Sequence, residues 1–147
     1  VVDGVILPQL KMKGQAESCS FLDANGRCSV HSFRPGICRL FPLGRYYEED
    51  GFRYFLQVNE CRKKDQSKIK VKKWLGILHL QSYEKYIWEW HRFLQICEEA
   101  MKTLDDENQR IFQLYILRTF YQTPYGEEFY QEFYQRMCEL KARLGLE

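Results

Sequence analysis

Six cysteines are the residues of this chain with the most specific chemistry, and four of them cluster. Cys19, Cys28, Cys38 and Cys61 follow the spacing Cys-x8-Cys-x9-Cys-x22-Cys in a stretch punctuated by Gly and Pro. Thiolates are soft ligands that suit zinc, iron and iron–sulfur clusters. Four thiolates around zinc form a closed structural site. The cluster therefore favours a metal centre, although its spacing is not that of a zinc finger and the chain contains no C-x2-C pair.

Spacing alone leaves two alternatives open for these cysteines. An even number of cysteines is typical of disulfides in a secreted protein, whereas clustered cysteines in a cytosolic protein more often bind metal. The other alternative is buried free thiols. This is how we interpret the two remaining cysteines, Cys97 and Cys138, because both lie in helical patterns far from the cluster.

The local sequence around the clustered cysteines is more specific than their spacing. It reads C-S-F-L-D at 19–23, G-R-C-S-V-H at 26–31 and R-P-G-I-C-R-L-F-P at 34–42. Together these segments closely resemble the YkgJ-type cysteine-cluster family, which is described as zinc- or iron-chelating and whose module flagellin lysine methylases share. The resemblance covers about residues 17–61. The metal ligands that it implies are Cys19, Cys28, Cys38 and Cys61.

One departure from that family concerns the number of ligands. The family's C-x-x-C-x-x-C-C-like element lies upstream of such a region, and no cysteine precedes Cys19 here. The chain begins at Val1 without an initiator Met, so we expect an N-terminal piece to be missing. Either the element precedes Val1 in the intact protein and the site is polynuclear, or the element was lost. The cofactor is accordingly zinc or iron, the latter as an ion or an iron–sulfur cluster.

Arg34 and Arg39 flank Cys38 and are candidates for a supporting role around the metal. Thiolate-ligated metal centres carry net negative charge, which nearby guanidinium groups offset while donating hydrogen bonds to sulfur. The alternative is that Arg34 pairs with an acidic residue such as Asp23 and serves the fold only.

The chain divides into two halves of different character, which predicts an α+β fold. Residues 1–61 form the cysteine-cluster part, with strand composition at 5–12 and 52–58. A turn is predicted over residues 23–26 (Asp-Ala-Asn-Gly), which would bring Cys19 and Cys28 together in a hairpin. A short helix is predicted between Ser32 and Pro42.

Residues 62–73 carry seven Lys/Arg against one Asp and are interpreted as a basic connector. Residues 74–147 show helical periodicity. They predict about three antiparallel helices, the second starting after capping residues at 105–108. We expect this helical part to pack on the cysteine part, giving one domain overall.

Overall composition narrows the class of protein. The formal charge of +2 does not favour a nucleic-acid partner. The chain contains no apolar run of about 18 residues, the length that would indicate a membrane span. We expect a cytoplasmic, bacterial-type protein that binds a metal ion and does not associate with a membrane, with another protein as a second candidate partner.

Three functions remain in competition. The leading hypothesis is a metal-binding module, structural or electron-carrying. The second is an enzyme related to flagellin lysine N-methylases, for which we identify no catalytic residue and no cofactor-binding motif. The third is a nucleic-acid-binding module that uses the basic stretch 62–73. This stretch is followed directly by Trp74, and basic residues next to an aromatic residue can bind single-stranded nucleic acid. A solvated linker is the commoner interpretation of such a stretch.

Overall fold

The computed structural model describes residues 5–15, 18–60 and 67–145. The chain divides into two compact units. The first consists of Val1–Gln9 and Lys85–Glu147 and is called the helical unit here. The second, Leu10–Glu84, contains the clustered cysteines and is called the cysteine unit.

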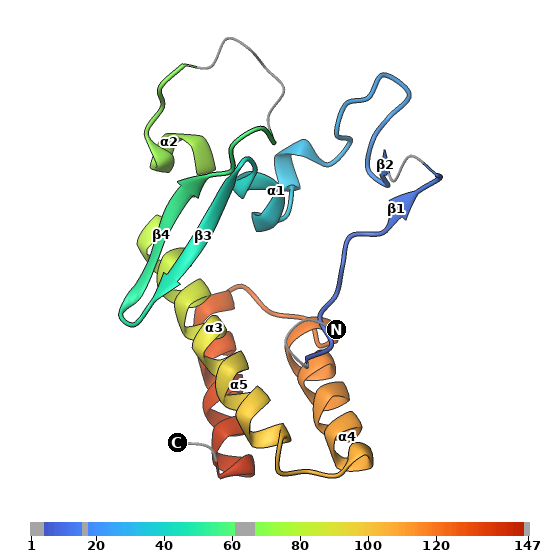
Figure 1. Ribbon diagram of the computed structural model, residues 1–147, viewed down its shortest axis with the longest axis vertical. Coiled ribbons are helices and arrows are strands. Elements are labelled where there is room, and N and C mark those ends of the chain that lie inside the picture. The colour runs from blue at the N-terminus through green and yellow to red at the C-terminus, as the bar shows by residue number, and fades with distance from the viewer. Residues whose placement is uncertain (1–4, 16–17, 61–66, 146–147) are drawn as a thin grey trace. The chain divides into compact units, whose positions relative to one another are not determined.

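The predicted α+β class is confirmed, with about 51% of the chain helical and 14% in short antiparallel strands. Figure 1 labels the elements along the chain. In order they are β1 (Met12–Lys13), β2 (Ser18–Cys19), the 3-10 turn η1 (His31–Phe33), α1 (Gly36–Leu40), β3 (Leu43–Glu48), β4 (Gly51–Leu56), α2 (Val71–Leu75), α3 (Leu80–Met101), α4 (Asp106–Leu117), the π-helical turn η2 (Arg118–Gln122) and α5 (Phe129–Leu144).

Three long helices build the helical unit, as the periodicity predicted. Within this unit α4 runs antiparallel to α3 and α5 (Figure 1). Each helix turns an apolar stripe inward, because residues three and four positions apart share one face. The core consists of Val5, Trp90, Phe93, Cys97, Met101, Phe112, Ile116, Phe120, Phe133, Met137 and Leu140. Aromatic rings dominate it, with the centroids of Trp90 and Phe120 4.7 Å apart.

The connection between α4 and α5 is held by one partly buried cation. Arg136 donates hydrogen bonds to the carbonyl oxygens of Thr119, Thr123 and Pro124, at 2.8, 2.9 and 2.5 Å. Its guanidinium carbon lies 3.9 Å from the ring centroid of Tyr125. A guanidinium suits this position because its planar donors can serve several carbonyls at once. The connecting segment at Thr123 and Pro124 is therefore fixed by a residue on α5.

A two-stranded hairpin is the largest sheet of the cysteine unit. β3 pairs antiparallel with β4, from Leu43 opposite Leu56 to Glu48 opposite Gly51. The sequence predicted a strand at 52–58 and the turn before it, but not β3. In this register Gly44 lies opposite Phe55. A Cβ on Gly44 would approach the Phe55 ring to 2.4 Å, so only glycine lets the ring lie flat on the strand.

Two segments differ from the sequence expectation. The range 5–12 has strand composition, but within it only Met12 belongs to a strand, and Val5 is buried with the helices. The connector 62–73 lies partly outside the described residues, at 62–66, and its last residues begin α2. The proposed domain boundaries remain a prediction.

The cysteine unit buries few side chains. Among its described residues the buried side chains are Leu40, Pro42 and Leu75, besides Gly44. Large apolar side chains are instead exposed, among them Phe33 at 87%, Ile37 at 63% and Val58 at 75%.

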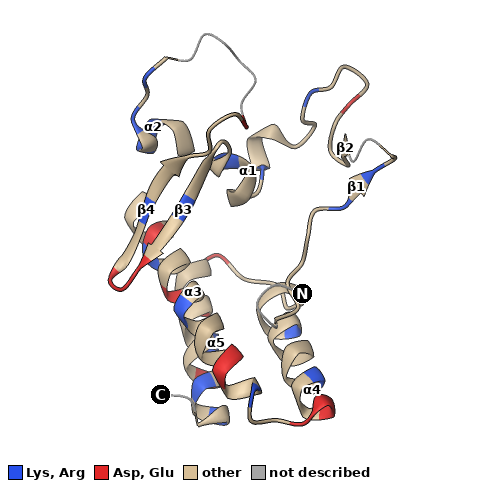
Figure 2. Ribbon diagram, in the orientation of Figure 1, with Lys and Arg blue, Asp and Glu red and all other residues tan. Residues whose placement is uncertain are grey.

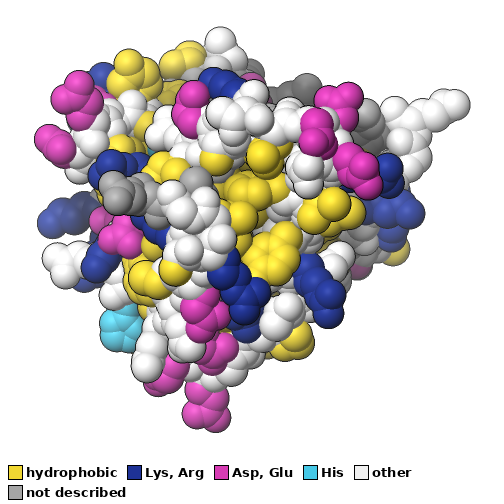
Figure 3. All heavy atoms as spheres, turned by 90° about the horizontal axis from the view of Figure 1, so that it is seen from below, with side chains coloured by type: hydrophobic (Ala, Val, Ile, Leu, Met, Phe, Trp, Pro, Cys, Tyr) yellow, Lys and Arg dark blue, Asp and Glu magenta, His cyan; other side chains and the backbone are white. Residues whose placement is uncertain are grey.

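Hydrophobic side chains also reach the surface on the face seen in Figure 3. None of the described helices is both long and apolar enough to cross a lipid bilayer.

Candidate metal centre

A tight turn brings Cys19 and Cys28 into the same small hairpin. The Asp23 carboxylate accepts hydrogen bonds from the backbone N–H groups of Asn25 and Arg27, both at 2.9 Å. An aspartate that accepts from the backbone two residues on is a strong turn former. Leu22 and Cys28 then form an antiparallel bridge, and the Leu22 N–H donates to the Cys19 carbonyl at 3.1 Å. The hairpin predicted over this range is thus confirmed.

Cys38 is supplied by α1, a single helical turn. Pro35 is the N-cap of this helix, and its carbonyl accepts from the Cys38 N–H at 3.0 Å and the Arg39 N–H at 3.1 Å. Proline suits a helix start because its missing N–H would have no partner there. The short helix predicted between Ser32 and Pro42 is thus present as α1.

The three described cysteines of the cluster lie within electrostatic reach of one another. Burial raises the pKa of the Cys38 thiol above its ordinary value, and the nearby Cys19 and Cys28 thiols raise this pKa further. The Arg34 guanidinium acts in the opposite direction on the same pKa. Charges act on a pKa in this way only at short range. The hairpin and α1 therefore bring three of the four predicted ligands into one neighbourhood.

These thiols are near one another without forming a finished ligand set. Over residues 5–15, 18–60 and 67–145, no three His, Cys, Asp or Glu side chains gather closely enough to hold a metal ion. The cysteines of the described ranges are all unpaired, so none of them forms a disulfide with another. Cys61, the fourth predicted ligand, lies outside the described residues.

The two predicted supporting arginines differ in their surroundings. Arg34 has a buried Nε without a hydrogen-bond partner in the described part of the chain, and its charge acts on Cys38. It forms no ion pair with Asp23 or any other described carboxylate. Arg39 instead donates to the Ser32 carbonyl at 3.2 Å. Of the two, Arg34 is the one whose charge acts on the Cys38 thiol.

Residues that the sequence analysis did not single out hold α1 in place. Tyr83 is one, because a Cβ on Gly36 would lie 2.6 Å from its hydroxyl oxygen. Arg45 donates to that hydroxyl at 2.7 Å, and its guanidinium carbon lies 5.5 Å from the Phe52 ring centroid. These contacts join positions far apart in the chain. The one local signal was the glycine itself, two residues before Cys38.

A second support comes from α2. The Trp74 Nε1–H donates to the carbonyl of Phe41 at 3.1 Å, just after α1 ends. Leu75, the next residue, is fully buried. α2 thus fastens the C-terminal end of the segment that carries Cys38.

Comparison with known proteins agrees with a metal-binding interpretation. The model of the CxxCxxCC family, described as "Putative zinc- or iron-chelating domain", matches residues 5–74. The match includes all four clustered cysteines and ends within α2, at its fourth residue, Trp74. No curated protein and no solved structure matches the chain. The family description supports metal binding in general and leaves the choice between zinc and iron open.

Proposed function

We propose that this protein is a metal-binding module in which Cys19, Cys28, Cys38 and Cys61 bind zinc or iron, the iron as an ion or an iron–sulfur cluster. The observation that supports the proposal is that Cys19 and Cys28 lie near enough to Cys38 to act on its charge, within the segment that the chelating-domain family matches.

The donor chemistry fits such a group. Thiolates are the ligands of closed zinc sites and of iron–sulfur clusters. Arg34, with its buried and unpartnered Nε, supplies positive charge beside them. A guanidinium in this position offsets the negative charge of a thiolate site and offers a donor to sulfur. When bound, zinc would supply structural cross-linking, and an iron–sulfur cluster would supply one-electron transfer.

The architecture of the cysteine unit supports a structural contribution from the metal. A unit of this size buries little surface by itself, and here the described buried side chains are few. Small domains of this kind are commonly stabilised by a metal, because binding and folding are coupled. The helical unit has a separate aromatic core and does not need this contribution.

The test is the metal content of the intact protein after anaerobic purification, with its visible absorption spectrum. Colourless protein with stoichiometric zinc would indicate a structural site, and brown protein with iron and sulfide would indicate a cluster. Cys38→Ser is expected to lose most of the metal. Cys138→Ser is the matched control, because Cys138 is exposed on α5. Equal metal content in wild type and Cys38→Ser, or absence of both metals from the wild type, would refute the proposal.

A further inference from the structure

We propose that the segment around α2 is a docking groove for an acidic segment of a partner protein, one that also presents an apolar side chain. The groove has a volume of about 470 Å³. Its walls are Lys70, Lys72, Lys73, Gly76, Ile77 and Leu78, and it is called the basic groove here.

The charge of this segment has no counterpart within it. Residues 67–78 contain four lysines, all exposed, and no acidic residue. Figure 2 shows α2 and the chain leading into it marked with basic residues alone. None of these lysines takes part in an ion pair with a described carboxylate. An unpaired cluster of one sign favours a partner surface of the opposite sign.

The groove also exposes apolar surface that a charged linker would not need. Leu78, one of its lining residues, is 89% exposed, and Ile69, next to Lys70 in the chain, is 47% exposed. Burying an exposed leucine side chain against a partner favours binding. The basic groove thus combines lysines that form no described ion pair with exposed apolar surface. This combination fits a partner segment that places one apolar side chain on the groove and surrounds it with carboxylates.

The surface is held in a defined shape. Leu75 anchors α2 from below with its fully buried side chain, and Trp74 is fixed by its hydrogen bond to Phe41. Gly76 ends the helix in the left-handed conformation, at a φ of 61°, which turns the chain so that Ile77 and Leu78 follow across the groove. A preformed surface of this kind loses less entropy when it binds than an unstructured linker.

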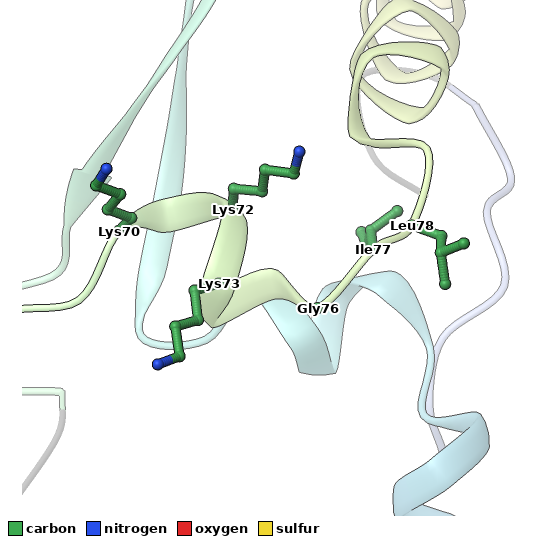
Figure 4. A pocket seen from close by; sticks show the side chains of 6 residues that line it. All are labelled: Lys70, Lys72, Lys73, Gly76, Ile77 and Leu78. Atoms are coloured by element: carbon green, nitrogen blue, oxygen red, sulfur yellow. The ribbon is translucent and has the colours of Figure 1, made fainter.

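The arrangement of the lysines distinguishes among anionic partners. In Figure 4, Lys70 and Lys72 extend to one side of α2 and Lys73 to the other, with Ile77 and Leu78 beyond Gly76. Ammonium groups spread in this way suit several separate carboxylates better than one compact anion. The groove is lined by aliphatic rather than aromatic side chains, so it lacks the stacking platform typical of single-stranded nucleic-acid sites.

The proposal is tested on the full chain by fluorescence anisotropy. The probe is a short labelled peptide with one leucine flanked by glutamates. Two control peptides replace either the leucine by serine or the glutamates by glutamines. A uridine oligonucleotide of the same charge and vesicles of phosphatidylcholine with phosphatidylglycerol serve as competing ligands. We expect the leucine–glutamate peptide to bind more tightly than all of these.

Variants of the groove decide whether binding occurs there. Lys72→Gln with Lys73→Gln is expected to weaken peptide binding about fivefold, and Leu78→Ser about tenfold. Lys11→Gln with Lys13→Gln is the matched control, because it removes the same charge from exposed residues elsewhere in the cysteine unit. This control is expected to bind like the wild type.

A charge exchange guards against variants that merely unfold. Lys72→Glu with Lys73→Glu is expected to lose the acidic peptide and gain a peptide in which lysines replace the glutamates. The proposal is overturned if the groove variants and the control bind alike. Tighter binding of the oligonucleotide or the vesicles than of the peptide would also overturn it.

Discussion

Arg45 on β3 donates a hydrogen bond of 2.7 Å from its Nη2 to the hydroxyl of Tyr83, in the first turn of α3. The guanidinium carbon also lies 5.5 Å from the ring centroids of Phe52 and Tyr83. The Arg45 Nε is buried without a partner among the described residues. Among the described residues the cation thus has tyrosine hydroxyls, that of Tyr83 among them, and ring faces as its partners, and it forms no ion pair with a carboxylate.

The first prediction follows from this contact. Tyr83→Phe keeps the ring but removes the acceptor, which leaves more of the buried guanidinium without a partner. Leaving a buried donor unsatisfied costs about 1–3 kcal/mol. We expect faster amide hydrogen exchange in β3 and β4, measured by NMR. Tyr46→Phe is the control on the same hairpin, because Tyr46 is 55% exposed and its hydroxyl is not expected to hold Arg45. Amide exchange in Tyr46→Phe as fast as in Tyr83→Phe would contradict the prediction.

A second prediction concerns the fit between Gly36 and Tyr83. A Cβ at position 36 would lie 2.6 Å from the tyrosine hydroxyl oxygen but 3.4 Å from the nearest ring carbon. Gly36→Ala is therefore expected to shift α1, and with it Cys38, and to lower the metal content of purified protein. In the double variant with Tyr83→Phe only the ordinary ring contact remains, so metal content should recover.

This double-mutant comparison separates a steric effect from a loss of helix geometry. Alanine favours a helix more than glycine does, so Gly36→Ala should not harm α1 through helix propensity. If Gly36→Ala acts through its contact with the Tyr83 hydroxyl, its effect should disappear when Tyr83→Phe removes that hydroxyl. If the double variant holds less metal than either single variant, the contact does not position α1 as we infer.

The third prediction concerns the buried thiol of the helical unit. Cys97 is fully buried, and burial raises its pKa from the ordinary value of 9.0 to about 12. The folded state therefore keeps a proton that the unfolded state releases. The contribution of the protonated Cys97 thiol to the stability of the folded state is fully present below pH 9 and is lost as pH rises from 9 towards 12.

Removal of this thiol should flatten the alkaline limb of stability. In Cys97→Ala the urea midpoint is expected to fall less between neutral and alkaline pH than in wild type, although packing lowers it at every pH. Cys138→Ala, at an exposed position, should retain the wild-type slope. Alkylation gives a second measurement: at mildly alkaline pH, mass spectrometry should detect modified Cys138 well before Cys97. Equal rates would show that Cys97 is accessible.

The helical unit followed from the sequence because its signals are local. The stripe through Trp90, Cys97 and Met101 repeats every three or four residues, and all three are buried on α3. The turn at Asp23 was equally readable, because the aspartate bonds to the backbone within four residues. Such patterns depend on neighbours in the chain and need no knowledge of the fold.

The missed features depend on contacts that span long stretches of chain. β3 contains Gly44 and Arg45, which do not follow strand alternation, and its pairing becomes understandable only with Phe55 lying over the glycine. α2 lies in a lysine-rich range that resembled a linker, and the buried Leu75 and the bond from Trp74 identify it as packed structure. The four-cysteine ligand set stays a prediction.

The last prediction concerns the start of α4, where Asp105 is the N-cap. Its Oδ1 accepts from the Asn108 N–H at 2.8 Å, and Oδ2 accepts from the Asn108 side chain at 2.7 Å. The backbone hydrogen bond, followed by the side-chain one, lowers the pKa of this carboxyl below its ordinary value of 3.8. The unfolded state thus takes up a proton at higher pH than the folded state.

The stabilisation from this cap is fully present above about pH 3.8 and is lost as pH falls through the lower folded-state pKa. Asparagine keeps an acceptor at the N-cap but carries no titratable proton. Asp105→Asn should therefore resemble wild type at neutral pH and show a shallower loss of helical circular dichroism in acid. Asp105→Ala should be less stable at both pH values, because the free N–H groups of the first turn lose their acceptor. An acid limb in Asp105→Asn as steep as in wild type would show that another carboxylate sets the acid sensitivity of this helix.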